Sequence, residues 1–172
     1  MNTLDTPEFF NAIGAALGLP AMQADASGTC TLSMGEKAVL TLALKPAPQA
    51  PDTDTVCDPM LVAFAYLGPL PGAEREATLA RLLEANFVWA ETGGGATLAL
   101  QPGTDAVNLM QQWRVTPELQ AAGVALWVAD FAEVANRWIQ ALEQADSPDS
   151  GAGESPELMP ASGGLASMMG MA

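Results

Sequence analysis

The residues of this chain that could support chemistry are two cysteines, several carboxylates and three consecutive glycines, because the sequence contains no histidine. Without histidine, Ser-His and Cys-His activation of a nucleophile is excluded, and so is the commonest metal ligand. Cys30 and Cys57 have no second pair of ligands for zinc and no flanking basic residues to lower a thiol pKa. We therefore expect no catalytic residue, no metal and no cofactor, and reduced thiols, although spacing alone leaves open whether these two cysteines pair.

Two groups of carboxylates could provide acid-base catalysis. Asp52, Asp54 and Asp58 fall in or beside a proline-rich segment, and Asp130 and Glu133 are three residues apart in an expected helix. General acids and bases need a site that holds them against a substrate, whereas a loop and one helix face expose them to water. We interpret both groups as solvated side chains, which leaves a carboxylate-based hydrolase or isomerase as an alternative class.

The stretch ANFVWAETGGGATLAL, residues 85–100, places Gly93, Gly94 and Gly95 between a helical pattern and an alternating strand pattern. A phosphate-binding loop has the opposite order, because its glycines follow a strand and lead into the amide end of a helix. No lysine follows these glycines either. We predict that they form a helix C-cap and a turn, with glycine supplying positive φ.

Apolar periodicity and start signals predict three helices. The first begins at Thr6-Pro7-Glu8, and the third begins at the similar Thr116-Pro117-Glu118 and fades near Ala145. The second begins near Ala73, carries the apolar stripe Leu79, Leu82, Leu83 and Phe87, and ends at the glycines.

Short alternating segments predict five strands between these helices. TCTLSM and AVLTLALK form an expected hairpin with a turn at Gly35-Glu36, and MLVAFAYLG reads as a central strand with both faces largely covered. ATLAL and residues 106–115 form a second antiparallel pair around the turn QPGTD. The order α-β-β-β-α-β-β-α predicts an α+β two-layer sandwich with an antiparallel sheet over residues 1–145. Residues 146–172 are rich in Ser, Gly, Pro and acid and are predicted to be a disordered tail.

The composition excludes several classes of partner. Six basic and twenty acidic residues give a formal net charge of −14, which repels nucleic acid and anionic membrane surfaces. No apolar run reaches the length of a membrane span, and MNTLDTPEFF lacks the pattern of a secretory signal. We therefore expect a cytosolic protein whose negative charge keeps an apolar binding surface in solution.

The segment LARLLEANFVWAETGGGATLALQPGTDAVNLMQQW, together with the element order, size and acidity, resembles the class I type III secretion chaperones, the Tir chaperone family. The resemblance covers about residues 5–145. It implies a cytosolic bacterial homodimer without enzymatic activity that holds the N-terminal region of a secreted effector in an extended, export-competent state. It also implies a dimer interface on the second helix and a C-terminal strand, and effector contacts on the first helix and the sheet. A non-enzymatic regulatory or protein-binding domain of the same fold, unrelated to secretion, is the alternative.

Apolar residues of these elements are the candidates for both roles. The strands carry more apolar side chains than one core face requires, and methionines suit a surface that adapts to several clients. In the second helix, Leu82 and Trp89 are seven residues apart and lie partly off the Leu79–Leu83–Phe87 stripe. The candidate effector-binding residues are Phe10, Ile13, Leu32, Met34 and Leu42, and the candidate dimer-interface residues are Leu82, Trp89 and Trp113.

Overall fold

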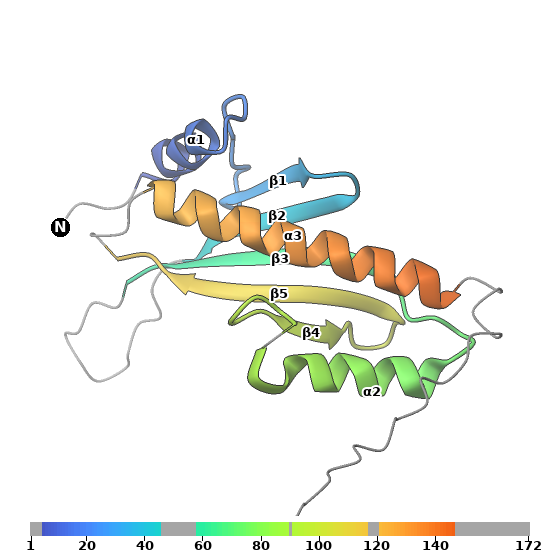
Figure 1. The fold of residues 1–172 in the computed structure, drawn as a ribbon. Coiled ribbons are helices and arrows are strands. Elements are labelled where there is room, and N and C mark those ends of the chain that lie inside the picture. Colours follow the sequence, from blue (N-terminus) through green and yellow to red (C-terminus); the bar gives the residue numbers. More distant parts are fainter. Residues whose placement is uncertain (1–4, 46–57, 90, 117–120, 147–172) are drawn as a thin grey trace, which may run out of the picture.

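The computed structural model describes residues 5–45, 58–89, 91–116 and 121–146. Three helices and five strands follow one another in the predicted order, with a short 3₁₀ turn after the second helix (Figure 1). The elements are α1 (Thr6–Ala16), β1 (Thr29–Met34), β2 (Ala38–Lys45), β3 (Met60–Pro69), α2 (Arg75–Asn86), η1 (Phe87–Trp89), β4 (Thr97–Leu100), β5 (Ala106–Arg114) and α3 (Ala121–Asp146). The predicted α+β class with an antiparallel sheet is confirmed.

The strands form one antiparallel sheet in the order β1-β2-β3-β5-β4. The β1–β2 hairpin pairs Thr29 with Ala43 and Met34 with Ala38, as its alternation predicts. β4 is short and covers β5 only from Val107 to Met110. The rest of β5 is therefore paired with β3 alone among the described strands.

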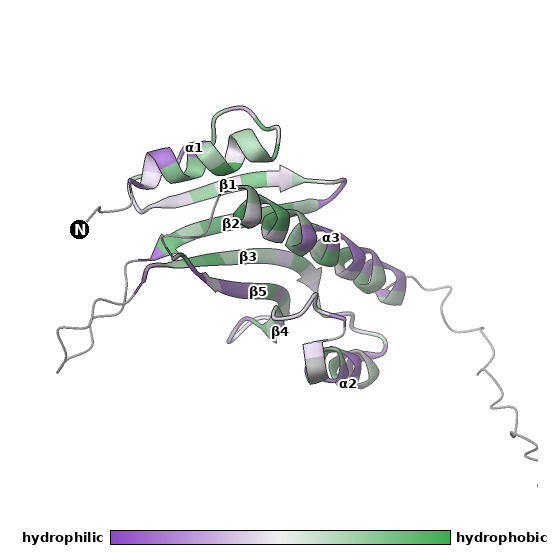
Figure 2. Ribbon diagram, turned by 60° about the vertical axis from the view of Figure 1, so that its left-hand side comes forward, coloured by the Kyte–Doolittle hydropathy of each residue, from purple (hydrophilic) through white to green (hydrophobic). Residues whose placement is uncertain are grey.

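Helices α1 and α3 lie on one face of the sheet, which we call the inner face, and α2 lies beside β4 (Figures 1 and 2). Every second residue of a strand points to the same face of the sheet, and on the inner face these residues are apolar. Figure 2 shows the apolar residues as green along β2 and β3. Leu40, Leu61 and Leu109 are fully buried there with Phe131 of α3. The hydrophobic core lies between the inner face of the sheet and the long amphipathic helix α3.

The opposite, outer face of the sheet is only partly covered by the described residues. Val39 and Tyr66 are exposed on it, and Phe64, which pairs with Met110, is half-buried. The prediction that β3 has both faces largely covered is therefore wrong for its Tyr66 end. The register of β3 also shifts between Tyr66 and Gly68, where a bulge ends the regular pairing with β5.

Two local predictions need correction. Asp5, and not Thr6, caps α1, because the Asp5 carboxylate accepts the amide hydrogen of Glu8 at 3.4 Å. The glycines do not cap α2 directly: that helix ends at Asn86, and η1 lies between it and the glycine turn. The turn still precedes a strand, so it has the opposite order to a phosphate loop, as predicted.

Several predictions fall outside the described residues. They concern Cys57, Asp52 and Asp54 in the proline-rich segment, and Pro117-Glu118 at the expected start of the third helix. The boundary between the folded domain and a disordered tail stays a prediction as well, since α3 is described to Asp146 and residues 147–172 are not described.

Candidate functional site

The free edge of the sheet at β1 exposes backbone hydrogen-bonding groups. Both the amide and the carbonyl of Thr29 point away from β2, because the Asp25 carboxylate accepts the amide hydrogen at 3.0 Å and the Asp25 amide donates to the carbonyl at 2.8 Å. In an antiparallel strand, this orientation repeats at every second residue. Thr31 and Ser33 therefore direct their amides and carbonyls to the same edge, where another strand can pair with them.

A small hollow with a partly apolar lining adjoins this edge. It has a volume of about 260 Å³ and lies between β1 and the segment that follows α1. Its apolar lining comes from Leu19, Met22, Cys30 and Leu32. Cys30 is a free thiol, and burial, together with the charge of Asp25, raises its pKa, so it acts there as a small apolar side chain and not as a thiolate.

The edge and the hollow are held in place by α3. Asn136 accepts hydrogen bonds from the amides of Lys37 and Ala38 at 3.1 and 3.0 Å, and donates one to the carbonyl of Met34 at 3.0 Å. Gly35 has a φ of +69°, and a Cβ at this position would lie 2.5 Å from the Asn136 amide nitrogen. The turn between β1 and β2 is therefore fixed against the helix, which gives β1 a rigid edge.

The predicted effector-binding residues divide into two groups in the structure. Phe10, Ile13 and Leu42 have no exposed surface and belong to the core, so a single chain offers them to no effector and their role stays a prediction. Their alternation and helical spacing marked a buried face, and α3 covers that face. Leu32 lines the hollow, and Met34 is half-buried at the end of the same strand.

The outward side of α2 and η1 carries three large apolar side chains that are exposed. Leu83 is 71% exposed, Phe87 is 78% exposed and Trp89 is 53% exposed. Leu82 is instead buried and belongs to the core cluster. Leu82 was expected to face a second copy of the chain, but it faces the core. Leu83 and Phe87, which were expected to pack on the sheet, point outward instead.

The orientation of α2 follows from its small residues and one polar side chain. Thr78 and Ala85 are buried on the same side as Leu82, and small side chains let the helix approach the sheet closely. Asn86 then binds both backbone groups of Leu98 at the edge of β4, at 2.8 and 3.0 Å. Arg81 lies over the ring of Trp138 in α3, at 5.3 Å from its centroid.

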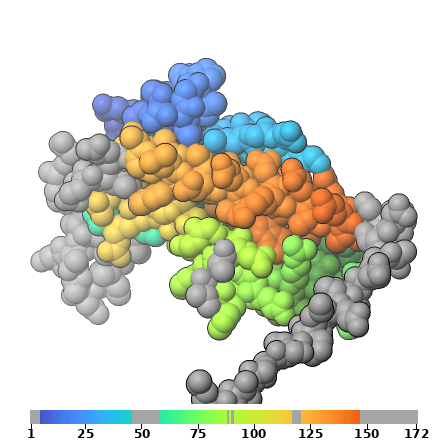
Figure 3. Space-filling model, viewed as in Figure 1, coloured from blue at the N-terminus to red at the C-terminus, as the bar shows by residue number. Residues whose placement is uncertain are grey.

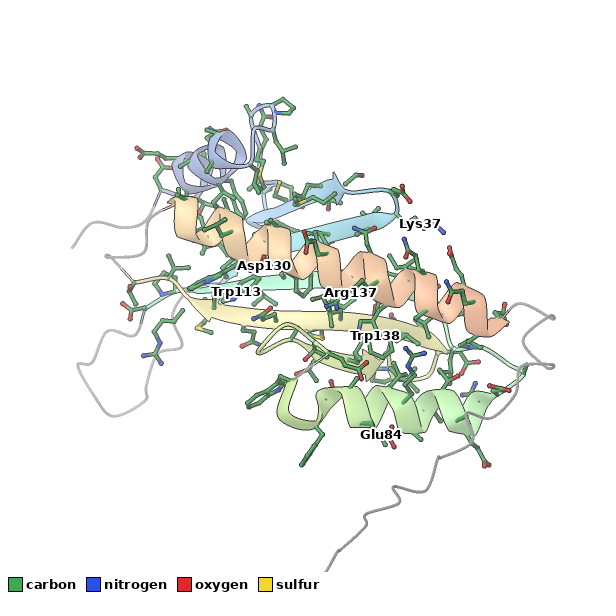
Figure 4. The ribbon with its side chains drawn as sticks, in the orientation of Figure 1. Lys37, Glu84, Trp113, Asp130, Arg137 and Trp138 are labelled. Carbon is green, nitrogen blue, oxygen red and sulfur yellow. The ribbon has the colours of Figure 1, made fainter. Side chains whose placement is uncertain are left out.

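Trp113, the third predicted dimer residue, lies beneath α3. Its ring stacks on Trp127 with centroids 5.8 Å apart and meets Phe131 edge to face. It is buried in the single chain, and its expected role at a dimer interface stays a prediction. Figure 4 shows Trp113 on β5 close to Asp130 on α3.

The three glycines form one wall of a second cavity, which has a volume of about 460 Å³. Both Trp113 and Asp130 line it, together with residues of β5 and α3. Gly93 must be glycine because its φ is +75° and a Cβ would lie 2.9 Å from the Val134 side chain. Figure 3 shows α3, in orange, meeting the green segment after α2 on the face that is in view.

In the described part of the chain, a metal site would need clustered ligands and a membrane span would need a long apolar helix. No group of three or more His, Cys, Asp and Glu residues is arranged to hold a metal ion there. Among the described helices, none is long and apolar enough to cross a bilayer. The ion pairs Lys37–Glu143 and Arg75–Asp105 are exposed, so each contributes little to stability.

The fold is that of solved type III secretion chaperone complexes. A chain of the complex of the Yersinia pestis type III secretion chaperone SycH with a fragment of YscM2 shares 19% identity and a TM-score of 0.54, over 78% of this chain and 99% of that one. A chain of the HopA1–SchA chaperone–effector complex shares 17% identity and a TM-score of 0.54, over 77% of this chain and 91% of that one. A chain of the ExoU–SpcU complex from the type III secretion system of Pseudomonas aeruginosa shares 18% identity and a TM-score of 0.51, over 78% of this chain and 98% of that one.

The sequence itself identifies the family. Residues 8–145 match the Tir chaperone protein (CesT) family, and this range includes every described helix and strand apart from the start of α1 and the end of α3. The chain belongs to the Tir chaperone protein (CesT) family. No curated protein sequence matches it. The resemblance that the glycine-containing segment indicated is confirmed.

Proposed function

We propose that this chain is a cytoplasmic type III secretion chaperone without enzymatic activity, which binds the N-terminal region of a secreted effector and keeps it soluble and export-competent. The observation that carries the proposal is the family match over residues 8–145 combined with an open strand edge beside a partly apolar hollow. The complexes of similar fold contain a bound effector or protein fragment. A regulatory domain of the same fold unrelated to secretion has no observation in its favour.

The β1 edge can bind a polypeptide segment that has no folded structure of its own. An extended segment can pair with the outward amides and carbonyls of Thr31 and Ser33, which recognise any backbone. Alternate side chains of that segment then face the hollow between β1 and the segment after α1, where Leu19, Met22 and Leu32 favour apolar groups. Backbone pairing supplies affinity, and the size and apolar lining of the hollow supply selectivity.

We propose further that two copies associate through α2. Leu83, Phe87 and Trp89 are large apolar side chains that the described residues of a single chain leave exposed. A two-fold axis would place the same patch of each copy against the other. The α2 surface lies beside β4, at the opposite edge of the sheet from β1, so a dimer would leave both β1 edges open.

A substitution at the β1 edge tests the effector-binding proposal. The tagged protein is first purified from its native bacterial cytosol, and the co-purifying secreted protein is identified by mass spectrometry. Its N-terminal region is then titrated against wild type and Thr31→Pro by isothermal calorimetry. Proline removes the outward amide hydrogen and places a ring in the path of an added strand, while an edge strand tolerates it. We expect affinity to fall at least about tenfold, since a lost hydrogen bond of about 1 kcal/mol is accompanied by steric exclusion.

Thr31→Ala is the matched control, because it removes the side-chain hydroxyl but keeps the backbone amide. It should bind the effector region with nearly wild-type affinity. Circular dichroism must show that both variants are folded. Equal affinities of Thr31→Pro and Thr31→Ala would show that the effector does not pair with β1.

A further inference from the structure

The cavity beside the glycine turn is a second, chemically different recess. It opens where β4 stops, because β4 covers β5 only to Met110 and the glycine turn lies beside the remainder. It is at the opposite side of the sheet from the β1 edge, since β1 and β4 are the two end strands. The residues lining it are Thr92, Gly93, Gly94, Gly95, Gln111, Gln112, Trp113, Trp127, Asp130, Phe131 and Val134.

One wall of this cavity combines an aromatic face with a carboxylate. Trp127 and Asp130 are three residues apart on α3, so they lie on the same side of the helix. One face of the Trp127 ring stacks on Trp113, and the residue keeps 37% of its surface exposed. An indole face beside a carboxylate attracts a cation twice, through the ring quadrupole and through the charge.

The other wall is polar and comes from Thr92 and two glutamines of β5. Thr92 is 1% exposed, and its hydroxyl oxygen has no hydrogen-bond partner among the described residues. Gln111 and Gln112 add amide groups on β5. No lysine or arginine belongs to the described residues that line the cavity, so Asp130 has no basic neighbour within this lining. A ligand with several N–H donors and a positive charge would suit the Asp130 carboxylate and the side-chain carbonyls of Gln111 and Gln112 together.

We propose that this cavity binds the guanidinium group of an arginine side chain in a bound polypeptide. The planar guanidinium lies against the exposed face of Trp127 and donates hydrogen bonds to the Asp130 carboxylate and to the side-chain carbonyls of Gln111 and Gln112. Arginine fits better than lysine because its five donors and flat shape match an aromatic wall and several acceptors at once. The inference rests on the proposed function only in that the arginine belongs to a captured polypeptide segment.

A small peptide probe tests the site on the full chain. Acetyl-Gly-Arg-Gly-amide is titrated into ¹⁵N-labelled protein, and the indole resonance of Trp127 and the amide resonances of Gly93, Gly94 and Gly95 are followed. We expect saturable shifts at these four residues, while the indole of Trp89 on the α2 surface stays unmoved. The same peptide with citrulline, which has the same shape without the charge, should bind at least about fivefold more weakly.

Two isosteric variants separate the cavity from general attraction by the acidic surface. Asp130→Asn removes the carboxylate from the lining and should lower the affinity for the arginine peptide about two- to fivefold. Glu133→Gln removes an exposed carboxylate of the same helix that does not line the cavity, and it should leave the affinity unchanged. Both residues are exposed, so both variants should keep the wild-type spectrum in the absence of peptide.

Three results would overturn the inference: no saturable shift at the cavity residues, equal binding of the citrulline peptide, or equal effects of Asp130→Asn and Glu133→Gln. Tighter binding of free L-arginine than of the capped peptide would also overturn it, because the site would then recognise the amino acid and not a polypeptide side chain. None of these measurements involves the β1 edge. A negative result for the arginine site therefore does not change the expected result for Thr31→Pro. A negative result for Thr31→Pro likewise does not change the expected binding of the arginine peptide.

Discussion

Replacing Leu83 by glutamate should dissociate the proposed dimer without unfolding the chain. The side chain is 71% exposed on the outward face of α2, so the single chain loses almost no packing when it changes. In a two-fold dimer through this face, the same side chain is buried against the partner and a carboxylate there would lose its water. The variant therefore separates association from folding.

The magnitude follows from the exposed fraction. Full burial of a leucine side chain is worth about 1.5–3 kcal/mol. With 71% of Leu83 still to be covered, each copy contributes about 1–2 kcal/mol to association. An isologous interface contains the residue twice, which gives about 2–4 kcal/mol, or roughly a 30- to 1,000-fold increase in the dissociation constant. Burial of the carboxylates adds to this value.

Sedimentation equilibrium at several micromolar concentrations measures the effect. Wild type should sediment at about twice the chain mass and Leu83→Glu as a monomer, with the same circular dichroism spectrum. Ala77→Glu is the matched control, because Ala77 is also exposed on α2 but lies about 120° around the helix from Leu83. A wild-type monomer, or a Leu83→Glu dimer as stable as that of Ala77→Glu, would refute the reasoning.

Two further predictions concern how the β1 edge is held. Asn136→Ala should lower the free energy of unfolding by about 1–3 kcal/mol in urea titrations, because the amides of Lys37 and Ala38 lose their acceptor; an unchanged value would contradict the bracing role. The Ser27 hydroxyl, and then the amides of Thr29 and Ser27, hold the Asp25 pKa below its ordinary value. Because the folded pKa is the lower one, this contribution to stability is present above about pH 3.9 and is lost as the pH falls through the folded pKa. The melting temperatures of wild type and Asp25→Asn should therefore converge as the pH is lowered from 5 toward 2, and a constant difference would exclude this linkage.

Local signals in the sequence account for most of the fold. The alternation of TCTLSM and AVLTLALK around Gly35 predicts the β1–β2 hairpin, and the structure has the same pairing. The glycines after ANFVWAET predict a turn that leads into a strand, which the structure also shows. These features depend on neighbouring residues, so a linear pattern contains enough information to predict them.

Part of the candidate site could be predicted in the same way. Leu32 was a candidate from its alternation and does line the hollow at the β1 edge. The same reasoning chose Phe10, Ile13 and Leu42, which are fully buried. An apolar periodic pattern shows that a face is hidden, but it does not show whether the chain itself or a partner hides it.

The sequence alone determined the family, the element order, the absence of histidine chemistry and the acidic character of this protein. Only the tertiary structure decided which apolar stripe of α2 faces inward, that β1 is one of the two end strands of the sheet, and that Trp127, Asp130 and Thr92 line one cavity. Element type follows from contacts a few residues apart, which periodicity records. Exposure and the convergence of distant side chains follow from how whole elements pack, and small buried residues such as Thr78 and Ala85 decide that by letting α2 approach the β4 edge on one side only.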